Sequence, residues 1–104
     1  MAHRVVVRPA AAGDLTAIYD WIADRADPQT ARAYRERIIA ACARLADFPN
    51  RGSARDDVRP GLRTIAFQRR AVIVYLVEED EVRIARVLHH GQDLSRAFDD
   101  PGSG

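Results

Sequence analysis

One histidine and several arginines give this sequence its clearest potential for chemistry. The segment "VRIARVLHH" has the alternating apolar pattern of a strand and ends in two histidines, of which the first is His89. A histidine at a strand end acts as a general acid where neighbouring charges set its pKa, and Arg86, Arg63 and Arg70 are the candidates to supply them. The same imidazole can instead hydrogen-bond at the strand end and order the last turn. Both roles stay open at this point.

Arginine is the only strongly basic residue type in the chain. All 16 basic residues are arginine, and 15 acidic residues leave a formal net charge of +1. The lack of lysine excludes a phosphate-loop lysine, a Schiff-base lysine and a lysine acid or base. The planar, permanently charged guanidinium suits carboxylates and phosphates better than proton transfer. The near-neutral balance does not favour a protein that coats nucleic acid, so local patches must carry any such contact.

Trp21 and two arginines of the predicted strands are candidates for contacts with a partner. Trp21 lies roughly 110° from the middle of the apolar stripe of its predicted helix, so we expect it to be partly exposed. It either packs over the edge of the helices or anchors a protein interface. Arg63 and Arg86 are candidates to grip an acidic segment, while Arg83 is placed to pair with the acidic turn before it. Strand alternation predicts that Arg83 and Arg86 point to opposite faces.

The first half of the chain predicts a strand and two helices. Residues 3–9 are rich in β-branched residues, and an amphipathic helix with Asp14 on its polar side, or as its N-cap, follows them. Asp27 is the predicted N-cap of a second helix, with Pro28 at its first position. This helix is expected to run to about Phe48, where "FPNRG" stops it. Two helices joined by so few residues pack as an antiparallel hairpin.

The second half of the chain predicts three strands. The β-rich runs are "LRTIAF" (62–67), "AVIVYLV" (71–77) and "VRIARVLHH" (82–90), separated by short polar turns. The middle run is apolar at both parities, as in a central strand. The order β-α-α-β-β-β predicts an α+β fold with the helical hairpin packed on one face of a small, mainly antiparallel sheet. The opposite face is expected to be open, as a groove for a peptide or a nucleic-acid backbone.

The length suits one domain, which we expect over residues 1–95, with a flexible tail over residues 96–104. No segment has the pattern of a secretion signal or a membrane span. The single cysteine, Cys42, cannot form an internal disulfide, which fits a reducing cytoplasm. Cys42 and Tyr34 lie on the core stripe of the second helix, so we expect no reactive thiol. Three histidines and one cysteine show no metal-ligand spacing, and no cofactor is implied.

Four segments together resemble the toxins of the RelE/ParE superfamily of bacterial toxin–antitoxin modules. They are "RPAAAGDLTAIYDWIA", "FPNRG", "DDVRPGLRTI" and "VIVYLVEEDEVRIARVLHH" with Asp93 after it, and they occur in this order over residues 3–95. The superfamily divides by function. RelE-like toxins enter the ribosomal A site and cut mRNA, whereas ParE-like toxins inhibit DNA gyrase without cutting RNA.

The chemistry of RNA cleavage separates the two branches. It needs a base, an acid and cations, which this superfamily commonly supplies as lysines or glutamate, arginines, and a histidine or tyrosine near the end of the last strand. Here "LRTIAF" has no acidic residue, histidine or lysine, the central strand offers only Tyr75, and no tyrosine follows His90. Gln92 and Asp93 stand where the family often has an Arg-Asp pair. These absences, with "RPGLR" and "RVLH", favour the ParE branch.

The resemblance therefore implies the toxin of a type II toxin–antitoxin system in the cytoplasm. It implies an inhibitor of DNA gyrase rather than an enzyme, neutralised by a ParD-like antitoxin in a hetero-oligomer. The candidate partner-binding residues are Trp21, Arg63, Arg70, Arg86 and His89. The alternative is a RelE-like ribosome-dependent mRNA endonuclease with His89, Arg86 and Arg63 as catalytic residues. A third alternative is a degenerate toxin that binds its antitoxin without harming the cell.

Overall fold

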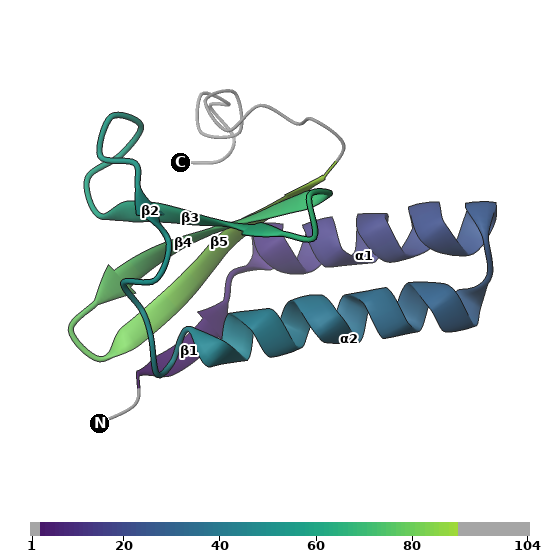
Figure 1. The fold of residues 1–104 in the computed structure, drawn as a ribbon, viewed down its shortest axis with the longest axis horizontal. Helices are drawn as coiled ribbons and strands as arrows, with labels where there is room; N and C mark the ends of the chain where they lie inside the picture. The colour runs from purple at the N-terminus through teal and green to yellow at the C-terminus, as the bar shows by residue number, and fades with distance from the viewer. Residues whose placement is uncertain (1–2, 90–104) are drawn as a thin grey trace.

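The computed structural model describes residues 3–89, which form two helices packed against one face of a five-stranded sheet (Figure 1). The α+β prediction and the order β-α-α-β-β-β of its main elements are confirmed. The elements are β1 (Arg4–Val7), α1 (Pro9–Arg25), α2 (Pro28–Arg44), β2 (Ser53–Ala54), β3 (Leu62–Phe67), β4 (Ala71–Glu78) and β5 (Glu81–His89). His90, Gln92, Asp93 and the predicted tail over residues 96–104 lie outside the described residues.

The sheet joins the first strand to the last. Its order is β1-β5-β4-β3-β2, with β1 parallel to β5 and every other neighbouring pair antiparallel. The helical hairpin carries the chain away from β1, so that the later strands can pair beside it. The prediction of a mainly antiparallel sheet is confirmed. The two-residue strand β2 was not predicted, because it lies in a polar connector.

Both helices begin with proline at the first position. The N-cap Arg8 of α1 is extended and makes no side-chain hydrogen bond, so the prediction of Asp14 as N-cap is wrong. Proline suits this position because its missing N–H has no partner in a first helical turn. The predicted N-cap Asp27 of α2 is confirmed, since its carboxylate accepts from the backbone N–H of Thr30 at 2.7 Å. The helix ends at Arg44, before the predicted Phe48, and a turn follows it.

The central strand β4 is buried on both faces, as its sequence predicts. Ala71, Ile73 and Tyr75 join the main core under the helices, together with the predicted core residues Tyr34 and Cys42. The alternate residues of β4 face the other way, where a second cluster forms. It contains Leu62, Val74 and Leu88, with Val58, Val72 and Leu76 packed against it. The expectation of an open opposite face is therefore wrong at this cluster, because apolar side chains on three strands gather there with Val58 of the preceding loop.

A β-bulge changes the direction of side chains in β5. The pairing shifts between Val74 and Tyr75 of β4, so that Arg83 lies opposite Leu76 and Arg86 opposite Val74. Directly paired residues share a face, and Leu76 and Val74 alternate onto the same one. Arg83 and Arg86 therefore occupy positions on one face, and the prediction of opposite faces is wrong. The extra residue, Ala85, was not recognisable from alternation alone. Arg83 pairs with Glu81 and Glu78 of the acidic turn, as expected.

Candidate functional site

Arg86 is held by a carboxylate from α1. Strand β1 pairs with β5 only as far as Val7 and Ile84, so the last part of β5 has an edge without a strand in the described chain. Asp14 fills this place, since its Oδ2 accepts from the backbone N–H of Val87 at 2.8 Å and from Arg86 Nε at 2.8 Å. Its Oδ1 accepts from Arg86 Nη2 at 2.9 Å. The Asp14 side chain is only 12 % exposed and the Arg86 side chain only 21 %. This bidentate pair fixes the end of β5 against α1.

His89 lies at the end of β5 among aromatic rings. Only 7 % of the residue is exposed. Its ring packs edge-on against Trp21 of α1, with centroids 5.5 Å apart, and against Tyr34 of α2 at 6.0 Å. The imidazole thus connects the last strand to both helices.

Trp21 is half-buried, so the expected partial exposure is confirmed. In addition to His89, its ring contacts the guanidinium of Arg25, whose Cζ lies 4.2 Å from the ring centroid. This distance is typical of a cation–π contact. Trp21 therefore packs at the edge of the hairpin and still presents part of its surface.

Arg70 belongs to the same end of the sheet as His89. It is the last residue of the turn between β3 and β4, where Gln68 and Arg69 adopt φ values of 50° and 62°. Because Ala71 pairs with His89, the turn places Arg70 beside the end of β5. Arg70 and His89 line one cavity of about 260 Å³, and Arg70 also lines a cavity of about 520 Å³ beside α2. The candidates Trp21, Arg70 and His89 are therefore brought together.

Arg63 lies elsewhere and holds a loop. Its Nη2 donates to the backbone carbonyls of Asn50, at 2.8 Å, and Gly52, both between α2 and β2. It pairs with Tyr75, whereas His89 pairs with Ala71, four residues along β4. At about 3.3 Å per residue, these positions are roughly 13 Å apart along the strand. The structure does not bring the candidate catalytic residues Arg63, Arg86 and His89 into one cluster.

Gly52 allows this loop to lie against the sheet. A Cβ atom there would be 2.5 Å from the carbonyl oxygen of Thr64 and 2.7 Å from the hydroxyl oxygen of Tyr75. That hydroxyl accepts from the backbone N–H of Gly52 at 2.9 Å. The sequence indicated Gly52 only as a helix breaker, and Tyr75, which is fully buried, only as an isolated polar group. Both are structural residues of the loop.

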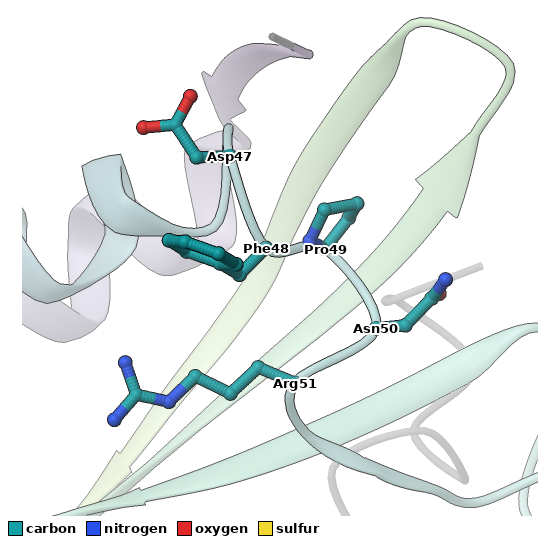
Figure 2. A pocket seen from close by; sticks show the side chains of 5 residues that line it. All are labelled: Asp47, Phe48, Pro49, Asn50 and Arg51. Carbon is teal, nitrogen blue, oxygen red and sulfur yellow. The ribbon is translucent and has the colours of Figure 1, made fainter.

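The same loop forms an open surface depression of about 600 Å³ lined by residues 47–51 (Figure 2). The side chains of Phe48 and Arg51 extend in the same direction from the backbone. Phe48 is 64 % exposed, and Ile39 on α2 is 46 % exposed. Single exposed apolar side chains are common on soluble proteins, so Phe48 is a candidate contact residue only because it also lines this depression.

Sequence reasoning missed the roles of Asp14 and Tyr34. Asp14 was assigned to the polar side of its helix, and Tyr34 to the core. Burial raises the pKa of Tyr34, and the charge of Arg70 partly offsets this effect. The tyrosine is thus a protonated donor at neutral pH, beside an arginine. No short-range pattern links a helix residue to an arginine in the turn between β3 and β4.

Residues 3–89 contain no metal site, reactive thiol or membrane-spanning helix. No group of three or more histidine, cysteine, aspartate or glutamate residues there has the arrangement of a metal site. Burial raises the pKa of the Cys42 thiol to about 11, so it is protonated at neutral pH. Neither of the two helices in this range has the length and apolar character needed to cross a membrane.

Comparison with known proteins gives consistent matches over nearly the whole chain. A sequence profile described as "ParE toxin of type II toxin-antitoxin system, parDE" matches residues 5–94. Toxin ParE1 of Mycobacterium tuberculosis is 31 % identical over 96 residues, which cover 92 % of this chain and 98 % of that protein. Toxin ParE3 of Caulobacter vibrioides is 34 % identical over 92 residues, covering 88 % and 91 %.

A structural relative agrees with these sequence matches. A solved structure of the chromosomal ParDE TA system from P. aeruginosa superposes with a TM-score of 0.75 at 27 % identity. The match covers 85 % of this chain and 96 % of that one. The two helices and the sheet of this chain therefore have the same fold as a chain in that solved toxin–antitoxin structure. This chain belongs to the ParE toxin family of type II toxin–antitoxin systems.

Proposed function

We propose that this toxin inhibits DNA gyrase in the bacterial cytoplasm by binding it, without catalysing a reaction. The observation that carries the proposal is the separation of the three residues that an RNA-cleaving alternative would use. Arg86 is paired with Asp14, Arg63 with loop carbonyls, and His89 packs among aromatic rings. Each has a structural role that accounts for its presence in the sequence.

The separation matters because RNA cleavage requires its groups to meet at one phosphate. A general acid must come within about 2.6–3.2 Å of the oxygen it protonates, and the cations must contact the same phosphate. Arg63 is held by the carbonyls of Asn50 and Gly52, and Arg86 by the carboxylate of Asp14, so these hydrogen bonds would have to break before both guanidinium groups could contact a phosphate beside His89. Membership of the ParE family supports the gyrase target over the ribosome.

We further propose that a ParD-like antitoxin neutralises the toxin in a hetero-oligomer. The family description and the solved relative both name a ParDE pair. The end of the sheet with Trp21, Arg70 and His89, and the loop with Phe48, are the surfaces offered for such contacts. Trp21 and Phe48 provide apolar area, and Arg70 provides charge.

The test is DNA supercoiling by purified gyrase in the presence of the folded, antitoxin-free chain. The expected result is inhibition that rises with toxin concentration, accumulation of cleaved DNA, and reversal by stoichiometric antitoxin. Absence of inhibition at a large molar excess of folded toxin would remove the proposal.

A second assay addresses the endonuclease alternative. The chain is incubated with ribosomes translating a defined mRNA, and the mRNA is mapped for cleavage. The variant His89→Phe retains an aromatic ring beside Trp21 and Tyr34 but has no proton to transfer. We expect no cleavage by the wild type. Cleavage that disappears in His89→Phe would favour the endonuclease.

A further inference from the structure

A cavity between α2 and the β3–β4 turn is lined by three side chains whose donors have no hydrogen-bond acceptor within residues 3–89. Its volume is about 520 Å³, and its lining includes Tyr34 and Arg37 from α2 together with Gln68 and Arg70 from the turn. Two segments that are far apart in sequence therefore build it. The turn lies next to the end of β5, so the cavity adjoins the cluster of Trp21 and His89.

The Tyr34 hydroxyl is the first unmatched donor. The residue is 7 % exposed, and its hydroxyl is buried with no hydrogen-bond partner among the residues that the structure describes. Most buried polar groups in native proteins have a partner, so an exception calls for an explanation. The ring is held by edge-on contacts with Phe67, at 5.6 Å, and His89, at 6.0 Å. These contacts fix the position of the ring, and the hydroxyl has no acceptor within residues 3–89.

Two guanidinium groups provide the remaining donors. Arg37 and Arg70 are exposed, and neither makes an ion pair or a side-chain hydrogen bond within residues 3–89. In contrast, Arg63 and Arg86 each donate to protein oxygens. Arg70 and Tyr34 line the same cavity, and the charge of Arg70 acts to lower the pKa of the Tyr34 hydroxyl.

The charge of the cavity selects a carboxylate. Asp27 is part of the lining, and the hydrogen bonds from Thr30 hold its pKa below the usual range, so it is anionic at neutral pH. Two guanidinium groups and one carboxylate leave one net positive charge. A carboxylate carries one negative charge, whereas inorganic phosphate or a phosphate monoester carries nearly two at neutral pH. The cavity therefore matches a carboxylate better than either of these phosphate groups.

We propose that this cavity binds a glutamate or aspartate side chain of the antitoxin. The carboxylate lies between Arg37 and Arg70 and accepts a hydrogen bond from the Tyr34 hydroxyl. The choice of partner rests on the proposed neutralisation by an antitoxin, while the choice of carboxylate rests on the cavity alone. A carboxylate gives the buried hydroxyl an acceptor and gives the two guanidinium groups a negative charge, whereas a glutamine side chain gives an acceptor without the charge.

The experiment is an NMR titration of the full, antitoxin-free chain with N-acetyl-glutamate N-methylamide as the probe. The arginine Nε–Hε signals are followed, with N-acetyl-glutamine N-methylamide and inorganic phosphate as competing ligands. We expect saturable shifts of the Arg37 and Arg70 signals with a dissociation constant on the order of millimolar, as suits so few contacting atoms. Arg32, exposed on α2 outside the cavity, is the internal control.

Two variants locate the binding. Arg70→Gln is expected to weaken the probe about tenfold and Tyr34→Phe about fivefold, while Arg32→Gln leaves it unchanged. Tyr34→Phe is also expected to melt at the same temperature as the wild type or higher, because it removes an unmatched buried hydroxyl. If a variant binds the probe more weakly but melts at the wild-type temperature, the substituted side chain contributes to binding and not to folding.

The outcomes are distinct. Equal binding of the glutamine probe, tighter binding of phosphate, or no saturable shift would overturn the carboxylate site. The titration is then repeated with the toxin–antitoxin complex, where we expect the probe to be excluded. Binding of the probe in the complex would overturn the antitoxin as occupant. Neither measurement involves gyrase, so a failure here is separate from a failure of gyrase inhibition.

Discussion

The two ends of β3 use arginine in opposite ways. At one end, Arg63 donates to the carbonyls of Asn50 and Gly52 and holds the loop after α2 against the sheet. At the other end, Arg70 shares a cavity with Arg37 and makes no ion pair within the described part of the chain. The first end is internally matched, and the second carries surplus donors. The difference separates arginines that stabilise the fold from arginines available to a partner.

The largest effect is expected where the mostly buried pair of Asp14 and Arg86 joins α1 to β5. Asp14→Ala leaves the Arg86 guanidinium without its carboxylate and the Val87 N–H without its acceptor. Discounted for partial exposure, the loss is about 2–3 kcal/mol of unfolding free energy in urea. Asp20→Ala, at an exposed position of the same helix, serves as the control and should change stability by less than about 0.5 kcal/mol. Equal effects of the two substitutions would deny the pair this role.

The loop at the matched end is expected to be sensitive to one methyl group. Gly52→Ala places a Cβ atom against the Thr64 carbonyl and the Tyr75 hydroxyl, so the loop must move. We expect a loss of about 2 kcal/mol, measured by thermal or urea unfolding. Gly13→Ala is the matched control, because nothing lies within 4 Å of its added Cβ and the position is helical. It should stabilise the protein by up to about 1 kcal/mol.

The comparison itself is tested by the same substitution at both ends. Arg63→Gln loses hydrogen bonds to two carbonyls and should cost about 1–2 kcal/mol, whereas Arg70→Gln should change stability by less than about 0.5 kcal/mol. Unfolding of both variants in urea gives the values. If Arg70→Gln proves as destabilising as Arg63→Gln, the division between the two ends does not hold.

The smallest effect concerns the ionisation of Asp27 at the cavity. Its folded-state pKa is lowered by the hydrogen bonds from Thr30, so it contributes stability above its unfolded pKa, about 4. This contribution disappears as the pH falls through the lower, folded value. Asp27→Asn keeps a capping side chain without a charge. The stability difference between wild type and variant, measured from pH 6 to pH 2, should shrink towards acid, and a constant difference would exclude this linkage.

The elements that depend on nearby residues were predictable from the sequence. Asp27 and Pro28 are adjacent residues and together indicate the start of α2. The residues of β3 were also predicted correctly, from Leu62 to Phe67. Alternation and composition also gave the central position of β4. Such signals are local, because capping and strand periodicity involve residues close in the chain.

The details of the site depend on residues that meet only in the folded chain. Asp14 and Arg86 are 72 residues apart, and their contact removes Arg86 from the groove that the sequence suggested. The bulge at Ala85 inverts the expected faces, although its residues look like a regular strand. The Tyr34 hydroxyl and Arg70 likewise meet through the β3–β4 turn. Neither periodicity nor composition encodes these tertiary contacts, so only the structure identifies them.

The most direct test of the central claim is the supercoiling activity of purified gyrase as the antitoxin-free toxin is added. The account predicts inhibition that increases with toxin concentration, with intact ribosome-bound mRNA in a parallel sample. Full gyrase activity at saturating folded toxin, together with cleaved mRNA, would contradict it.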